Sequence, residues 1–169
     1  MQRDSSNFDI AAICDVLAHH GVEYVVIGGV AAVLHGADLL TQDFDVVPQG
    51  GDANLMRLTE ALFDLEAEVS FAGKVRRFPD GDWLLASRTW TFETRLGPFD
   101  VLFHPDGAPE YDLLRGMASE QQVGDGLAIQ VASLDDLISM KRAAGRPKDL
   151  NALPLLEYLR DRQANPPPA

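Results

Sequence analysis

Two aspartates separated by one residue are the strongest chemical signal in the sequence. Asp43 and Asp45 stand in the run Leu40-Thr41-Gln42-Asp43-Phe44-Asp45-Val46-Val47. If residues 43–47 form a strand, both carboxylates point to one face and Phe44 points to the other, into a core. Like charges side by side on a strand repel each other, and a divalent cation is the usual remedy. The pair therefore indicates a Mg²⁺ site for phosphoryl-type chemistry, with a polar strand end or turn as the alternative.

Two other features could meet this pair at one site. Gly28-Gly29 follows a buried-type strand, where glycines let backbone amides approach a phosphate and a helix start favours an anion. Asp100 lies in an apolar run that indicates a central strand, where an unpaired carboxylate costs several kcal/mol. Three carboxylates on adjacent strands would hold two Mg²⁺ about 4 Å apart. The alternatives are a tight turn without a ligand for the glycines and an arginine partner for Asp100.

The elements around these residues predict an α/β (α+β) fold with one small mixed β-sheet flanked by helices. Ser133 and Asp136 form a capping box before one helix, and Ser6 is the expected cap of the first helix. Predicted helices cover residues 6–20, 30–35, 52–65, 109–118 and 134–144, and a last helix begins at Pro147, which Pro154 should kink or split. Predicted strands cover residues 22–27, 43–47, 83–85, 88–95, 99–103 and 127–131.

Length and composition fit one globular domain over residues 1–162, followed by a disordered proline-rich tail over 163–169. We expect no membrane span and no signal peptide, because no apolar run is long enough. The single cysteine, Cys14, excludes an internal disulfide and lies on the apolar side of a helix, which predicts a buried, inert thiol in a reducing cytoplasm.

The net charge of −12 excludes a general polyanion binder. Most of the 14 basic residues nevertheless gather in two segments, which are either solvated faces or two phosphate-binding patches. The first segment holds Lys74, Arg76, Arg77, Arg88 and Arg95, and the second holds Lys141, Arg142, Arg146 and Lys148.

Gly28-Gly29, followed after 13 residues by Asp43-Phe44-Asp45 and later by Asp100 on a strand, resembles the DNA polymerase β-type nucleotidyltransferase superfamily. The closer resemblance is to its AbiEii/MenT-type toxin branch, over roughly residues 22–150. That resemblance is carried by Gly29-Val30-Ala31, His35-Gly36, Thr41-Gln42-Asp43-Phe44-Asp45, Leu134-Asp135-Asp136-Leu137-Ile138-Ser139-Met140-Lys141 and Arg146-Pro147-Lys148-Asp149.

The resemblance implies a nucleotidyltransferase-like fold and a set of site residues. Asp43, Asp45 and Asp100 would carry metal, and Gly28 and Gly29 would lie under the triphosphate. Thr41 would belong to the nucleotide-binding run, Lys141 would contact phosphate, and Asp149 would border the site. From the residues alone, Lys141 could instead be an exposed helix lysine, and Asp149 a carboxylate that offsets a helix dipole.

The implied activity is Mg²⁺-dependent transfer of an NMP from an NTP to a hydroxyl, with release of pyrophosphate. The acceptor could be a tRNA 3′ end, a protein side chain or a small molecule, and the toxin branch implies an antitoxin partner. A catalytically silent module that binds nucleotide or a partner is the alternative. The sequence departs from the branch at Leu39, where many relatives have an arginine, and Asp38 precedes it.

Overall fold

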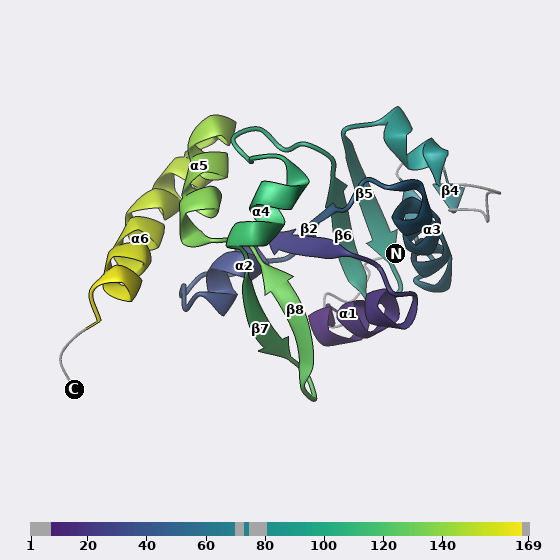
Figure 1. The fold of residues 1–169 in the computed structure, drawn as a ribbon, viewed down its shortest axis with the longest axis horizontal. Helices are drawn as coiled ribbons and strands as arrows, with labels where there is room; N and C mark the ends of the chain where they lie inside the picture. Colours follow the sequence, from purple (N-terminus) through teal and green to yellow (C-terminus); the bar gives the residue numbers. More distant parts are fainter. Residues whose placement is uncertain (1–7, 70–72, 75–80, 167–169) are drawn as a thin grey trace, which may run out of the picture.

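The computed structural model describes residues 8–69, 73–74 and 81–166, which build one mixed sheet flanked by helices (Figure 1). The strands follow the order β4-β3-β5-β6-β2-β1-β8-β7 across the sheet. They are β1 (Tyr24–Ile27), β2 (Phe44–Pro48), β3 (Glu68–Val69), β4 (Gly73–Lys74), β5 (Thr89–Thr94), β6 (Gly97–Leu102), β7 (Ser119–Val123) and β8 (Leu127–Val131). The helices are α1 (Ile10–His19), α2 (Gly28–Leu34), α3 (Asp52–Asp64), the 3₁₀ helix η1 (Asp82–Ala86), α4 (Tyr111–Met117), α5 (Leu134–Ala144) and α6 (Pro147–Ala164). The predicted fold class is confirmed.

Strand pairing places β2 at the centre of the sheet. It runs antiparallel to β1 and parallel to β6. Phe44 of β2 and Phe99 of β6 are fully buried, and their rings stack with centroids 5.7 Å apart. The residues that alternate with them, among them Asp45 and Asp100, point to the opposite face of the sheet. The predicted alternation of core and polar residues on β2 therefore holds over residues 44–46, and Val47 and Pro48 are both buried.

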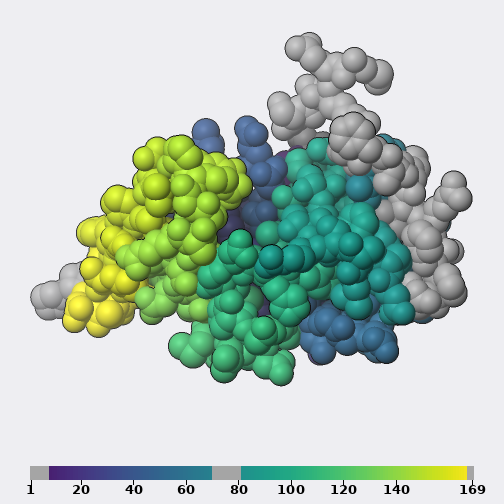
Figure 2. All heavy atoms as spheres, turned by 90° about the horizontal axis from the view of Figure 1, so that it is seen from above, coloured from purple at the N-terminus to yellow at the C-terminus, as the bar shows by residue number. Residues whose placement is uncertain are grey.

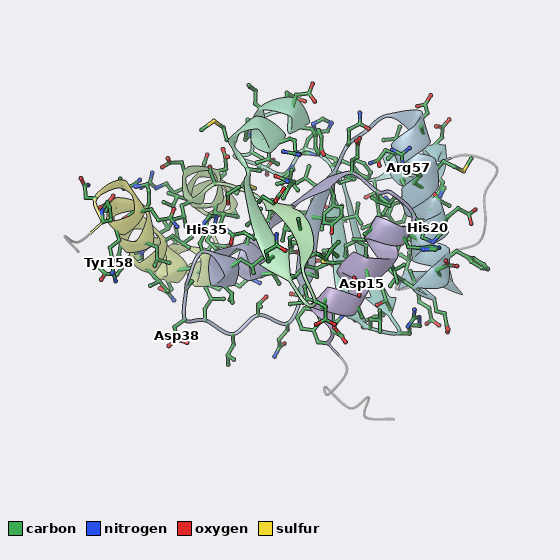
Figure 3. All side chains as sticks on the ribbon, turned by 60° about the horizontal axis from the view of Figure 1, so that its bottom comes forward. Asp15, His20, His35, Asp38, Arg57 and Tyr158 are labelled. Carbon is green, nitrogen blue, oxygen red and sulfur yellow. The ribbon has the colours of Figure 1, made fainter. Side chains whose placement is uncertain are left out.

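The helices gather at the two ends of the sheet. Helices α1 and α3 contact each other at one end, and α5 and α6 contact each other at the other (Figure 1). His20, just after α1, reaches the side of α3, where its Nε2 lies 2.7 Å from a carboxylate oxygen of Asp64 (Figure 3). No described helix has the length and apolar character that a bilayer crossing requires.

The start of α1 differs from the prediction. Asp9 is its N-cap, and the carboxylate accepts a hydrogen bond of 3.0 Å from the Ala12 amide. Ser6, the expected cap, lies outside the described residues. The predicted apolar stripe is buried and includes Cys14, and burial raises the pKa of its thiol to about 11. A thiol with so high a pKa is unreactive near neutral pH, as the sequence indicated.

Two predictions in the strand-rich middle were wrong or incomplete. Residues 83–85 lie in η1, not in a strand, and hydrogen bonds of two tryptophan indoles join this segment to α3 and β5. The Trp83 indole N–H donates to the Thr59 hydroxyl at 3.0 Å, and that of Trp90 donates to the Leu84 carbonyl at 2.7 Å. Strand β7 was missed, since its Ser-Glu-Gln-Gln composition is that of an edge strand, paired with β8 alone.

The end of the chain is more helical than predicted. Helix α6 passes through Pro154 without a break and continues to Ala164, so the first two residues of the predicted tail are helical. Proline removes one backbone hydrogen bond, and packing of α6 along α5 offsets that loss. Residues 167–169 lie outside the described part.

Helix α5 has the predicted boundaries. The Ser133 hydroxyl accepts a hydrogen bond of 3.1 Å from the Asp136 amide and donates one of 2.7 Å to the Asp136 carboxylate. Gly145 ends the helix in the left-handed conformation, with φ of 63°. Pro147 then occupies the first position of α6. This turn brings the side chains of α5 and α6 to one end of the sheet.

Candidate active site

Asp45 and Asp100 are direct neighbours across the parallel pair of strands β2 and β6. Burial, followed by the charges of Asp100 and Asp43, raises the pKa of Asp45 to about 7. Burial and the charge of Asp43 also raise the pKa of Asp100. A hydrogen bond with Thr91 lowers this pKa and offsets part of the rise. One oxygen of Asp100, Oδ1, is buried without a hydrogen-bond partner. The sheet therefore holds two carboxylates where neither is fully satisfied by the protein.

Asp43 lies one residue before β2 and is exposed. This corrects the expectation that it belongs to the strand. Its charge nevertheless raises the pKa of both Asp45 and Asp100, so it lies near them. Within the described residues, no three His, Cys, Asp or Glu side chains are grouped as a preformed metal site. Convergence of all three carboxylates on a metal remains a prediction.

The two glycines lie against the other residues of the motif. Gly28 has φ of 68°, and a Cβ there would stand 2.2 Å from Asp45 Oδ2. A Cβ on Gly29 would stand 2.6 Å from Thr41 Oγ1, and that hydroxyl donates to the Asp43 carbonyl at 3.2 Å. Only glycine fits at position 28, because both its conformation and its space exclude a side chain. The start of α2 is thereby held directly against Asp45 and Thr41.

A buried carboxylate organises the cations of α5 and α6. Asp149 is 2% exposed and accepts hydrogen bonds from Lys141 at 3.2 Å and from Arg146 at 2.6 Å. Burial alone would raise the pKa of Asp149, but these two partners lower it overall. The Lys141 charge also lowers the pKa of Asp45. Lys141 is thus a half-buried part of the site, and Asp149 positions it.

Part of this set lines a cavity of about 330 Å³, and Asp43, Asp100, Gly29 and Thr41 are not among its lining residues. Gly28 and Asp45 belong to its lining, together with Lys141, Arg146 and Asp149. Figure 2 shows the hollow between the yellow-green C-terminal helices and the teal strand region, with dark blue residues from early in the chain at its floor. Apolar side chains of α5 and of the end of β6 cover the rest of the wall, among them Leu137, Met140, Ala144, Leu102 and Phe103. The cavity has the size of a small-ligand site and is lined by both charged and apolar side chains.

The loop after β6 supplies residues that sequence analysis did not assign to the site. His104 and Asp106 line the cavity, and the Arg88 guanidinium donates to the His104 carbonyl and, at 3.1 Å, to the Asp106 carboxylate. His104 has φ of 53°, an uncommon conformation for a residue with a side chain. The imidazole Nδ1 lies 3.5 Å from a Glu110 carboxylate oxygen. The polar run that follows the strand of Asp100 was the signal that could have identified this loop.

The two basic segments meet this cavity only in part. Arg88 lies on one wall, and Lys141 and Arg146 lie on the other. Arg95 instead donates to the Asp64 carbonyl of α3, and Arg142 pairs with Glu157 of α6. Arg76 and Arg77 lie outside the described residues, as does the side chain of Lys74.

The departure at Leu39 has a packing explanation. Leu39 is partly buried against the core, and its Cδ1 would stand 3.7 Å from a Cβ on Gly29. Asp38 is exposed on the loop between α2 and β2 (Figure 3). The position that carries an arginine in many proteins of the resembled branch therefore supports the glycine turn in this chain.

The carboxylate pair fits a divalent cation. Carboxylate oxygens are the ligands that Mg²⁺ prefers, and the unpartnered Asp100 Oδ1 has a free coordination site. A cation would also relieve the repulsion that raises the pKa of Asp45 and Asp100. On these observations, Asp45 and Asp100 are suited to hold such an ion, and Asp43 is near enough to assist.

Comparison with solved structures shows a similar overall fold. The crystal structure of the lincosamide antibiotic adenylyltransferase LnuA with bound lincomycin superimposes with a TM-score of 0.59, over 88% of this chain and 94% of that one, at 16% identity. This chain therefore shares the overall fold of that adenylyltransferase. A Thermotoga maritima protein assigned as a nucleotidyltransferase is also similar, with a TM-score of 0.47 at 16% identity over 90% of this chain and 89% of its own. No model of a protein family matches the chain. No curated protein matches it in sequence.

Proposed function

We propose that this protein transfers an NMP from an NTP to a hydroxyl acceptor and releases pyrophosphate. The observation that carries the proposal is the Asp45–Asp100 pair, two like-charged neighbours on one sheet face with a buried unpartnered oxygen, set directly against the Gly28 turn. Two neighbouring carboxylates without a cationic partner destabilise a fold. A cationic ligand explains why they stand together. The shared fold with an adenylyltransferase agrees with the proposal.

The residues of the chain have distinct roles in this reaction. Asp43, Asp45 and Asp100 hold Mg²⁺, which, when bound, polarises the reacting α-phosphate. The backbone at Gly28 and Gly29 lies beneath the phosphates, where the start of α2 favours an anion. Lys141 and Arg146, both oriented by Asp149, supply positive charge on the α5–α6 side. The apolar wall of the cavity shields the nucleoside from water.

The first experiment separates binding from transfer. Thermal unfolding is followed with each of the four NTPs, with and without Mg²⁺, for the wild type, Asp45→Asn, Asp100→Asn and the exposed-loop control Asp38→Asn. We expect an NTP to stabilise the wild type and Asp38→Asn when Mg²⁺ is present, by mass action. The two site variants should fold, and should lose transfer by about a hundredfold or more. Absence of stabilisation by every NTP would contradict the proposal, and NTP binding without transfer would favour the catalytically silent module.

For the acceptor, we propose a tRNA 3′ end. Arg88 on one wall of the cavity and Lys141 and Arg146 on the other support this acceptor, since cations on both sides of a cavity suit a nucleic-acid strand. In a cell, the protein would then act as the toxin of a toxin–antitoxin pair. Growth arrest on expression, lost in Asp45→Asn and relieved by a neighbouring gene, would support that role.

A small hydroxyl compound is the second candidate acceptor. It is favoured by the fold shared with a lincosamide adenylyltransferase, and by the acidic partners that neutralise Arg88, Lys141 and Arg146. The deciding experiment incubates the protein with each α-labelled NTP and with total tRNA, a mixture of hydroxyl-bearing small molecules, or neither. Label in RNA supports the first acceptor, label in a small product supports the second, and label in the protein itself supports a side-chain acceptor.

A further inference from the structure

The described lining of the cavity holds one base whose side chain is bound to no cation. Of the lining carboxylates, Asp106 and Asp149 are paired with arginine or lysine, and Asp45 is suited to hold a divalent ion. The remaining base is the imidazole of His104. Histidine is the side chain that most readily exchanges a proton near neutral pH, so this residue is suited to proton transfer.

The loop that carries His104 is fastened on both sides. Arg88, just before β5, donates to the His104 carbonyl and, at 3.1 Å, to the Asp106 carboxylate. On the other side, the Ser139 hydroxyl of α5 donates to the Gly107 carbonyl at 2.7 Å. Gly107 has φ of 81°, and a Cβ there would stand 2.6 Å from the Ser139 carbonyl oxygen. The loop therefore bridges the start of β5 and helix α5 and is held in place at both contacts.

The conformation of His104 is one that its surroundings enforce. Its φ of 53° lies in the left-handed region, which is costly for a residue with a side chain and is found most often at functional sites. A carboxylate oxygen of Glu110 lies 3.5 Å from Nδ1 of the imidazole. A proton on Nδ1 faces that carboxylate and leaves the lone pair on Nε2, to which no described residue is bonded. Glu110 and the loop together present Nε2 as a base.

We infer that His104 is the general base that removes the proton from the acceptor hydroxyl. This inference rests on the proposed function. As the acceptor oxygen forms its bond to the α-phosphorus, its proton passes to Nε2 of His104. The bond from the α-phosphorus to the oxygen that bridges to the β-phosphate breaks, and its electron pair leaves with pyrophosphate. The imidazolium is stabilised by the Glu110 carboxylate and returns its proton to solvent.

The charges around the cavity place the acceptor on the side of His104. On the α5–α6 side, two cations share the single carboxylate of Asp149, which leaves one positive charge to attract the outer phosphates. Beside His104, Arg88 is balanced by Asp106. Attack and departure are in line in phosphoryl transfer, so the acceptor enters opposite the departing pyrophosphate, where His104 lies.

The test uses two substitutions that suit the left-handed backbone of His104. Asparagine tolerates this conformation and fills the space without a base, and glycine leaves room for added imidazole. Transfer of label from each α-labelled NTP with Mg²⁺ to total tRNA, and to a mixture of sugars and other polyols, is measured for the wild type, His104→Asn, His104→Gly and His19→Ala. His19→Ala is the matched control, because His19 is an exposed histidine of α1 outside the cavity lining.

We expect both His104 variants to lower kcat by about a hundredfold or more, as the loss of a general base does, and to keep the affinity for NTP within about twofold by calorimetry. Added imidazole should restore transfer in His104→Gly by about tenfold or more, because it supplies the missing base. It should not change the wild type, His104→Asn or His19→Ala. His19→Ala should transfer like the wild type.

The outcomes distinguish this inference from the function on which it rests. Transfer by His104→Asn within about threefold of the wild type would overturn the inference alone. A loss of NTP binding in both variants, or a loss of transfer in His104→Gly that imidazole does not restore, would also overturn it, because the histidine would then act through the fold. A wild type that transfers NMP neither to these acceptors nor to itself would refute the proposed function and the inference with it. Circular dichroism and the melting temperature of each variant establish that a loss of transfer is not a loss of fold.

Discussion

At the scale of single residues, the site is defined by charge that the protein leaves uncompensated. Asp45 and Asp100 are neighbours across two central strands, and two cations of the cavity, Lys141 and Arg146, are already bonded to Asp149. The fold thus keeps two repelling carboxylates instead of neutralising them with those cations. Such an arrangement lowers stability without a ligand and prepares the site for one.

The raised pKa of Asp45 gives a pH-dependent stability with a definite sign. Its pKa rises from 3.8 to about 7 on folding, so the folded protein binds the proton more tightly than the unfolded chain. The contribution of this group is full below about pH 4, falls as the pH rises, and is gone above about pH 7. Asp45→Asn cannot titrate. Its free energy of unfolding should therefore exceed that of the wild type by an amount that grows between pH 5 and about pH 7.

Urea denaturation at several pH values between about 5 and 8, without divalent cations, measures this difference. Asp38→Asn is the control, because it removes an exposed carboxylate from the loop that precedes β2, and its difference from the wild type should stay flat. A difference that stays constant for Asp45→Asn as well would show that Asp45 has an ordinary pKa in the folded protein. Mg²⁺ added near pH 8 should stabilise the wild type more than Asp45→Asn.

At the scale of elements, the α5–α6 hairpin positions the cations, and its two ends are set by local rules. Ser133 caps α5, and Gly145 ends it before Pro147 begins α6. Ser133→Ala removes a hydroxyl that both accepts from and donates to Asp136, so we expect a loss of about 1 kcal/mol in the free energy of unfolding. Urea denaturation measures it. Ser133→Asp should retain most of the stability, since aspartate also caps, and an equal loss in both variants would point to packing instead.

Elements that depend on residues close in sequence were predicted more accurately than elements that depend on contacts between distant residues. Helix α5 was predicted to the residue because its cap and its terminal glycine are local signals. Residues 83–85 were assigned wrongly because tryptophan hydrogen bonds to Thr59 and Leu84 decide their structure, and one of these spans 24 residues. Strand β7 was missed because its polar side chains lack an apolar alternation.

The arrangement of the candidate site was likewise predictable only where its residues are close in sequence. Gly28, Thr41 and Asp45 are close in sequence and were predicted together; Gly28 lies against Asp45, Gly29 lies against Thr41, and their roles stay a prediction. The register that sets Asp45 against Asp100 depends on strand order, which no local pattern specifies. The hydrogen bonds that Asp149 accepts from both Lys141 and Arg146 depend on the turn between α5 and α6. Arg88, His104 and Asp106 come together because one arginine folds the loop after β6.

At the scale of the whole molecule, an anionic substrate must reach a strongly acidic protein. The net charge is −12, so the field at long range repels nucleotides and RNA. Attraction begins only near the cavity, where Arg88, Lys141 and Arg146 line the walls and Lys148 lies beside them. An NTP needs only this small region, whereas an RNA must also lie over the surface around it. The charge distribution of the protein therefore discriminates better between an RNA acceptor and a small-molecule acceptor than the chemistry of the transfer step does.

The dependence of tRNA binding on salt concentration measures this difference between the two acceptors. If a tRNA end is the acceptor, each phosphate contact releases counterions, and the logarithm of the binding constant should fall linearly with the logarithm of salt concentration. With few cations available at the cavity, we expect a slope of about −2 to −3, since single-stranded contacts each contribute about −0.7. Fluorescence anisotropy of labelled tRNA between about 50 and 200 mM salt measures it. Arg88→Glu should flatten the slope and weaken binding, and Arg160→Glu in the C-terminal part of α6, whose arginine is paired with Asp135 and Asp161, should do neither. A slope near zero, or no binding at low salt, would exclude the tRNA end and leave a small hydroxyl compound as the acceptor to pursue.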